Sequence, residues 1–291
     1  MLSLKNHPSA AVFYLLASTL LFALVNVCLK NLPDIPAGEI ILFRSAISLG
    51  LTLLMLRAGR TAPWGHAPQR PDLVWRGVAG TAALVLGFLT IKQLPLAPAV
   101  TLQYLGPIFT AVAGIWLLGQ SVRRWQWLFF AISLGGVAVA QGVSHLGWVG
   151  VALGLGAAAT SGLSYVFNSR VGQKEHPLVV IFYFQLITLP VAVLWTAFDW
   201  HRPQGREWLW LAAVGMLTQA ALWCVTQSYQ RGKQAASIAA LDYLGLVYAA
   251  AFGYWFFDEK IKPLAYGGMA VVLLGVALNA WYSARQVKQE S

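Results

Sequence analysis

The chain has 291 residues, of which 58% are hydrophobic and only 10% are charged, and its mean hydropathy is +0.64. Soluble domains carry about 25% charged and about 45–50% apolar residues, so the composition excludes a soluble globular enzyme, a disordered chain and a small secreted scaffold. The net charge of +10 does not indicate a nucleic-acid partner, because the Lys and Arg residues stand singly or in pairs between apolar runs. Lipid must therefore surround most of the chain.

Long runs without charged residues divide the chain into membrane spans. A helix needs about 20 predominantly apolar residues to cross the hydrocarbon core of a bilayer. We predict ten helical spans, at residues 11–30, 38–57, 75–92, 98–119, 125–142, 147–168, 178–198, 208–229, 236–257 and 264–283. A β-barrel is excluded because the runs are continuously apolar and do not alternate. The predicted fold class is all-α, a polytopic membrane protein of ten transmembrane helices.

Polar side chains in the first two spans are the first candidates for function. A polar group inside the bilayer usually faces a neighbouring helix or a water-filled path, because exposure to lipid is costly. We therefore count Asn26 of the first span as a candidate substrate-binding residue. Glu39 and Arg44 lie near the outer start of the second span, and we interpret them as a structural ion pair or a gate.

The fourth span carries Gln103, Tyr104 and Pro107. Gln103 and Tyr104 are candidate substrate-binding residues, since an amide and an aromatic hydroxyl suit an amphipathic metabolite. The alternative is that the tyrosine packs one helix against another. Pro107 lacks a backbone N–H and predicts a kink or hinge near the middle of this span.

The sixth and eighth spans add further candidates. Gly150 and Gly154 give the sixth span a surface for close helix packing, and Tyr165 lies farther along it. Trp223 and Gln227 of the eighth span share a helix face, because residues four apart align. Tyr165, Trp223 and Gln227 are candidate substrate-binding residues, with core packing as the alternative for each.

The ninth span contains a carboxylate, Asp242, followed by Tyr243. Asp242 could recognise a substrate amino group or take up a proton, and the alternative is a structural pair with a nearby cation or hydroxyl. Both residues are candidates for substrate binding. They occupy positions equivalent to Gln103 and Tyr104 of the fourth span.

This equivalence reflects an internal repeat. Thr101-Leu-Gln-Tyr-Leu-Gly106 aligns with Ala240-Leu-Asp-Tyr-Leu-Gly245, and the same ungapped register pairs Gly114-Ile-Trp116 with Gly253-Tyr-Trp255. We predict two five-helix repeats, residues 1–143 and 144–291, within one transmembrane domain. An odd number of spans per repeat reverses the orientation of the second half, which is the inverted-repeat architecture of secondary transporters.

The two halves resemble the drug/metabolite transporter superfamily, specifically its EamA-type ten-helix exporters. The resemblance rests on Leu105-Gly-Pro-Ile-Phe109 and Leu118-Gly-Gln120, on their counterparts Leu244-Gly-Leu-Val247 and Phe257-Asp-Glu259, and on Phe43-Arg-Ser45. It implies export of amino acids or related metabolites, as in the YddG-like aromatic amino-acid exporters. This chain departs from the family pattern at Gln120, where Glu is frequent, and at Leu246, the counterpart of Pro107. These acid positions lie at helix ends near the membrane interface, so we expect them to have an architectural role and not to couple protons.

The basic residues predict the orientation. With the N-terminus inside, the inner segments hold thirteen Lys and Arg residues against six in the outer connections, which places both termini in the cytoplasm. The expected location is the plasma membrane, or the cell inner membrane if the source is bacterial. The sequence shows no nucleophile–base pair, phosphate loop or metal-ligand spacing, so we expect no enzymatic activity, cofactor or metal.

The sequence therefore predicts a secondary transporter that exports small amphipathic metabolites, namely aromatic or large neutral amino acids, by alternating access. A multidrug exporter of lipophilic compounds is the alternative, and an integral-membrane enzyme is a third possibility. The expected partners are a small-molecule substrate and the lipid bilayer, with no nucleic acid. We expect a monomer or a weak homo-oligomer.

Overall fold

The computed structural model of the chain describes residues 8–94, 99, 102–141, 147–232, 235–257 and 263–289. Every regular element within these residues is a helix, so the all-α prediction is confirmed there. Six of the helices in this described part of the chain are long and apolar enough to cross a membrane. Helices suit this medium because each satisfies its own backbone hydrogen bonds where lipid offers none.

The helices group into two compact units. Unit 1 comprises Met1–Thr81 and Phe167–Arg231, and unit 2 comprises Ala82–Val166 and Gly232–Ser291. Each unit therefore takes helices from both halves of the sequence.

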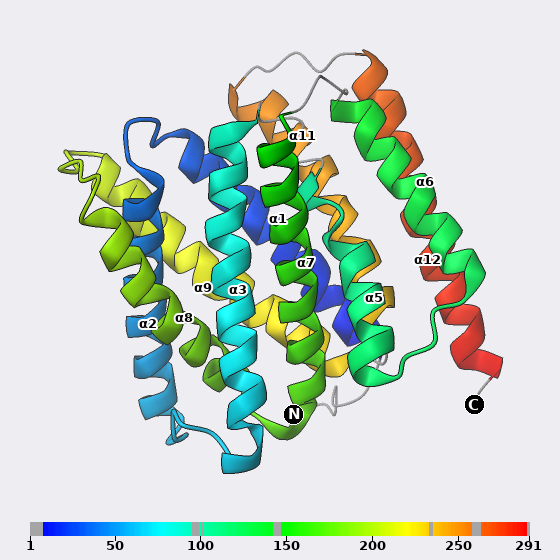
Figure 1. Cartoon of the computed structure of the whole chain (residues 1–291), viewed down its shortest axis with the longest axis horizontal. Helices are drawn as coiled ribbons and strands as arrows, with labels where there is room; N and C mark the ends of the chain where they lie inside the picture. Colours follow the sequence, from blue (N-terminus) through cyan, green and yellow to red (C-terminus); the bar gives the residue numbers. More distant parts are fainter. Residues whose placement is uncertain are drawn as a thin grey trace. The chain divides into compact units, whose positions relative to one another are not determined.

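Unit 1 is built around four long helices. They are α1 (Pro8–Lys30), α2 (Ala37–Ala58), α8 (Pro177–Thr196) and α9 (Glu207–Arg231), joined by η1 (Ala67–Gln69), the first part of α3 (Arg70–Gln93) and η2 (Gly172–Lys174). Helix α9 packs along α1 and α2, and α2 also packs along α8 (Figure 1). A core of Val25, Leu32, Ile40, Leu211 and Val214 joins α1, α2 and α9. Burial of such side chains stabilises the unit.

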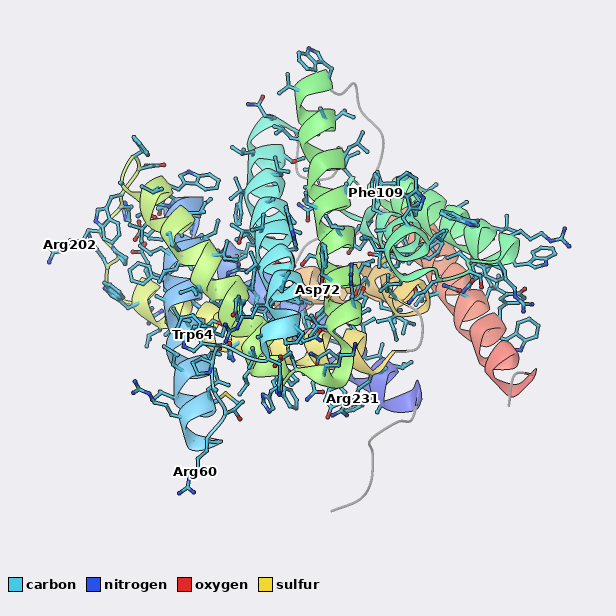
Figure 2. All side chains as sticks on the ribbon, turned by 60° about the horizontal axis from the view of Figure 1, so that its bottom comes forward. Arg60, Trp64, Asp72, Phe109, Arg202 and Arg231 are labelled. Atoms are coloured by element: carbon cyan, nitrogen blue, oxygen red, sulfur yellow. The ribbon has the colours of Figure 1, made fainter. Side chains whose placement is uncertain are left out.

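Several charged residues of unit 1 lie at or beyond helix ends. Arg60 follows the end of α2, and Arg202 lies in the connection before α9; both side chains extend away from the helices (Figure 2). Arg170 at the end of α7 forms an ion pair with Asp72 at the start of α3, with 3.2 Å between Nε and Oδ2. This distribution agrees with the predicted confinement of most charges to connections and span ends.

Unit 2 contains the remaining helices. They are the second part of α3, α5 (Gly106–Leu118), α6 (Arg124–Gln141), α7 (Trp148–Val171, whose last turn belongs to unit 1), α10 (Ala235–Ala239), η3 (Ala240–Tyr243), α11 (Leu244–Phe257) and α12 (Pro263–Gln289). Helices α6 and α12 run side by side (Figure 1). The predicted small-residue surface of α7 is confirmed, because Gly150 and Gly154 lie directly against Leu94 and Leu102.

The prediction of single continuous helices at 98–119 and 236–257 is wrong. The first is interrupted by a turn at residues 104–105 before α5, and the second by η3 between α10 and α11. In both, a leucine N–H donates to the carbonyl three residues back, from Leu105 to Leu102 at 3.1 Å and from Leu244 to Leu241. These tighter bonds are of the 3₁₀ type, which often marks a change in helix direction.

Pro107 also lies elsewhere than predicted. It stands in the first turn of α5, directly after the interruption, and not in the middle of a helix. Proline fits a first turn because the N–H groups there have no carbonyl partner within the helix. The interruption therefore precedes Pro107, and the proline begins the next helix.

Close packing of α6 on α12 generates the first testable prediction. A Cβ added at Gly136 would lie 2.7 Å from the Gly268 carbonyl oxygen and 2.8 Å from the Val272 nitrogen, whereas at the adjacent Gly135 it would meet nothing within 4 Å. We expect Gly136→Ala to lower the stability of the protein by about 1–3 kcal/mol, because backbone cannot move aside as a flexible side chain can.

The matched control is Gly135→Ala, which should be neutral or stabilising by up to about 1 kcal/mol, because alanine favours the helix over glycine. Thermal unfolding of both variants in detergent micelles measures the difference. Equal unfolding midpoints for the two variants would contradict the packing of α6 on α12.

Candidate functional site

The two helix interruptions of unit 2 bring Tyr104 and Tyr243 together. Their ring centroids lie 5.8 Å apart with an interplanar angle of 21°, a stacked arrangement. The Tyr243 side chain is fully buried, and its hydroxyl has no hydrogen-bond partner among the described residues. A buried hydroxyl of this kind usually finds a partner. A polar group of a ligand could supply it.

A carboxylate and an amide adjoin this tyrosine pair. Asp242 is partly exposed within η3, and its carboxylate interacts electrostatically with the hydroxyl groups of Tyr104 and Tyr243. Gln103 is exposed, and its Nε2 lies 3.6 Å from the position that a Cβ would occupy at Gly87 of α3. The structure thus brings Tyr104, Tyr243 and Asp242 together, and Gln103 is adjacent to Tyr104 in the chain; we call these four residues the polar corner. Its chemistry suits a molecule that carries both a positive charge and an aromatic ring.

Hydrogen bonds at the far end of α5 hold the two interrupted segments together. Gly119 ends α5 in the left-handed conformation, with φ of 62°, which glycine adopts without strain. The next residue, Gln120, accepts a hydrogen bond from the Ala235 N–H at 3.1 Å through Oε1 and so caps the start of α10. This contact supports the architectural role expected at position 120. The related Glu259 lies outside the described residues.

Helix α7 lies against α5 just after the interruption. A Cβ at Gly162 would approach the Thr110 backbone nitrogen to 2.6 Å, so only glycine permits this contact. Tyr165 follows three residues later in the same helix and is partly buried. It therefore belongs to the same unit as the polar corner.

The remaining candidates belong to unit 1. The Trp223 ring packs against Tyr14 in an edge-to-face arrangement, with centroids 5.5 Å apart. The Arg231 guanidinium lies over the Tyr14 ring, 4.9 Å from its centroid. Gln227 is buried on the same face of α9 as Trp223, and Asn26 is exposed on α1. Packing thus accounts for Trp223, and the role of these three residues in binding stays a prediction.

A buried polar cluster in unit 1 was not predicted. Ser48 of α2 donates a hydrogen bond to Gln219 Oε1 of α9 at 2.5 Å and accepts one from Gln185 Nε2 of α8 at 2.7 Å. Thr52, one turn farther along α2, also donates to Gln219 Oε1, at 3.2 Å. The sequence signal was the spacing of Ser48 and Thr52 on one face of a span. This spacing could not indicate the partners Gln185 and Gln219, because they lie on helices far from α2 in the sequence.

The interpretation of Glu39 and Arg44 as an ion pair is wrong. Glu39 Oε2 instead accepts a hydrogen bond from the His201 backbone N–H at 3.0 Å. Arg44 Nε and Nη2 are buried and have no hydrogen-bond partner among the described residues. The two residues are five positions apart in α2, so they lie on different faces of the helix.

The sequence pattern of known transporters fits the chain twice. The model of the EamA-like transporter family matches residues 9–141 and again residues 148–281. The chain belongs to this family. As an EamA-like transporter it is a multi-pass membrane protein that moves small molecules across the membrane and has a transport role, not an enzymatic one.

Individual relatives cover most of this EamA-like chain. The pseudopaline exporter CntI of Pseudomonas aeruginosa is 30% identical over 89% of this chain and 92% of its own length. Human solute carrier family 35 member G1 is 25% identical over 95% of this chain and 81% of its own length. A solved crystal structure superposes with a TM-score of 0.84 at 18% identity, covering 96% of this chain and 99% of its own, which supports the fold.

The tyrosine stack can be tested by a double-mutant cycle. We expect Tyr104→Ala and Tyr243→Ala to be non-additive in the free energy of unfolding by about 0.5–1.5 kcal/mol, the usual coupling of an aromatic pair. Thermal unfolding of the two single variants and the double variant in detergent measures the coupling. Tyr104→Phe is the control, because it keeps the ring, and it should retain the coupling to Tyr243. Additivity within about 0.3 kcal/mol would contradict the stack.

Proposed function

We propose that this protein exports small amphipathic metabolites, namely aromatic or large neutral amino acids, across the plasma membrane. The observation that carries the proposal is the pair of helix interruptions that gathers Tyr104, Tyr243 and Asp242. Discontinuous helices build the substrate sites of many secondary transporters, because irregular backbone at membrane depth lines a cavity. An aromatic side chain can pack on the tyrosine rings while its ammonium group pairs with Asp242.

Two further observations support export by alternating access. The relative with 30% identity is named as an exporter, which favours outward transport. The family model matches both halves of the chain, and Leu105 and Leu244 make the same short-range hydrogen bond at equivalent positions. We infer that residues 1–143 and 144–291 are five-helix repeats of opposite orientation, which make ten transmembrane helices with both termini in the cytoplasm. In a bacterium this membrane is the inner membrane.

The other predicted site residues have lesser roles in this proposal. Gln103 supplies a neutral polar group at the position equivalent to Asp242, and Pro107 allows the chain to change direction after Tyr104. Asn26, Tyr165, Trp223 and Gln227 are further proposed contacts of the substrate along its path. The protein acts as a monomer or a weak homo-oligomer.

Transport by purified protein in liposomes tests the proposal. We expect wild-type protein to exchange radiolabelled phenylalanine and tryptophan faster than alanine or glutamate. Asp242→Asn should slow this exchange at least about tenfold, because a hydrogen bond to a charged group contributes about 1.5–3 kcal/mol. The matched control is Asp199→Asn, which neutralises an exposed carboxylate in the connection before α9 and should exchange phenylalanine at the wild-type rate.

The rival function predicts a different pattern. A multidrug exporter would transport lipophilic cations, such as tetraphenylphosphonium, in preference to phenylalanine. Transport of these cations alone would replace the amino-acid proposal with the multidrug one. Phenylalanine exchange that Asp242→Asn leaves unchanged at every pH would remove Asp242 from substrate recognition and from proton coupling.

A further inference from the structure

A groove opens on the surface of unit 1 at the start of α9. Its volume is about 210 Å³, and its walls are Arg206, Leu209, Trp210 and Ala213. The last three follow Arg206 by three, four and seven positions, so all four residues share one face of the helix. Arg206 and Leu209 are exposed, whereas Trp210 and Ala213 pack against the core of α1, α2 and α9. The core therefore fixes one side of the groove, and the other side is open.

The chemistry of the groove changes from one end to the other. Arg206 directly precedes α9, which is long and apolar enough to cross a membrane. It places a positive charge at the end of this span, and the other three walls are apolar and lie within the span. Trp200 and Trp208, near the same end, are exposed, as is usual for aromatic side chains at the level of the lipid headgroups. The groove therefore leads from the headgroup region into the hydrocarbon.

The acidic residue beside Arg206 in the sequence is engaged elsewhere. Glu207 Oε2 accepts a hydrogen bond from the Gln204 backbone N–H at 2.6 Å. Successive residues are about 100° apart around a helix, so Glu207 lies on a different face from the groove. Arg206 takes part in the helix through its carbonyl, which accepts from the N–H groups of Leu209 at 3.0 Å and Trp210 at 3.2 Å. These bonds use the backbone alone and leave the guanidinium available to a ligand.

We propose that this groove binds an anionic phospholipid of the bilayer, with the phosphate at Arg206 and an acyl chain along Leu209, Trp210 and Ala213. A guanidinium can meet two phosphate oxygens with two parallel N–H groups. The seven residues from Arg206 to Ala213 extend about 10 Å along the helix, enough to hold the upper part of an acyl chain. A phospholipid offers the negative charge and the apolar chain in the same order as the groove. None of these four residues belongs to the proposed substrate path, so the site is additional to export.

Native mass spectrometry of the protein in detergent micelles, with added lipid, tests the headgroup contact. The wild-type protein should bind phosphatidylglycerol more tightly than phosphatidylcholine with the same acyl chains. Arg206→Gln should weaken phosphatidylglycerol binding about fivefold and leave phosphatidylcholine binding unchanged, because a basic residue near an anionic membrane surface contributes about 1 kcal/mol. The matched control is Arg202→Gln, which removes an exposed cation whose side chain extends away from the helices (Figure 2) and should bind both lipids as the wild type does.

Two further variants separate the charge from a structural role. Arg206→Lys keeps the positive charge and should retain most of the preference for phosphatidylglycerol. Arg206→Ser removes the charge and places a residue favoured before a helix, so it decides the matter if Arg206→Gln fails to fold. Equal losses in Arg206→Gln and Arg202→Gln would indicate general charge attraction and overturn the site. Equal wild-type affinity for the two lipids would also overturn it, as would displacement of the lipid by inorganic phosphate.

A photocrosslinker identifies what occupies the groove. Leu209 is 71% exposed, so a benzophenone side chain can replace it without disturbing the core. In vesicles of equal parts phosphatidylglycerol and phosphatidylcholine, illumination should attach phosphatidylglycerol in clear excess, and Arg206→Gln should remove that excess. Attachment of the two lipids in equal amounts, or of a second copy of the chain in place of lipid, would overturn the proposal.

Discussion

Lipid offers the peptide backbone no hydrogen-bond partner, and this constraint governs the whole molecule. Long apolar helices such as α1 and α9 meet it by closing their interior backbone hydrogen bonds within themselves. The segments around Tyr104 and Tyr243 satisfy their backbone differently. In each, a leucine N–H donates to the carbonyl three residues back, at a turn before α5 and at η3 between α10 and α11. Such irregular backbone is tolerated at membrane depth only where it is buried in protein or lines a water-filled cavity. The two interruptions lie at matching positions of the internal sequence alignment, and both contribute a tyrosine to the stacked pair.

The same constraint explains the polar residues inside the spans. Ser48 and Thr52 are costly in lipid unless they are paired, and they share Gln219 as an acceptor. Other polar atoms stay unpaired among the described residues, notably the Tyr243 hydroxyl in unit 2 and two nitrogens of Arg44 in unit 1. Buried polar groups in folded proteins are nearly always satisfied, so each unpaired atom of this kind calls for an explanation.

The sequence predicted the position of the helices well, but of their interruptions it indicated only a kink near Pro107 and missed the one before Leu244. Apolar length alone placed α1 at 11–30, against the observed Pro8–Lys30, and α9 at 208–229, against Glu207–Arg231. It could not detect the break before Leu244, because apolar length does not distinguish a 3₁₀ turn from an α-helix. The internal repeat did pair Tyr104 with Tyr243, which the structure stacks. The predicted ion pair of Glu39 with Arg44 is wrong because the Glu39 carboxylate accepts a hydrogen bond from the His201 backbone N–H instead. His201 lies in a connection, and the sequence does not show which path that connection follows.

Accessibility to water tests most directly whether the interruptions line a transport path. Cys28 and Cys224 are both buried and can be replaced by alanine, after which a single cysteine is introduced at Gln103, beside the first interruption. Leu274, which is 55% exposed in the middle of α12, provides the lipid-facing control. The account predicts that a membrane-impermeant thiol reagent labels Gln103→Cys in liposomes far faster than Leu274→Cys, and that phenylalanine slows this labelling. Equal labelling rates at the two positions would contradict a water-filled path at the interrupted helices.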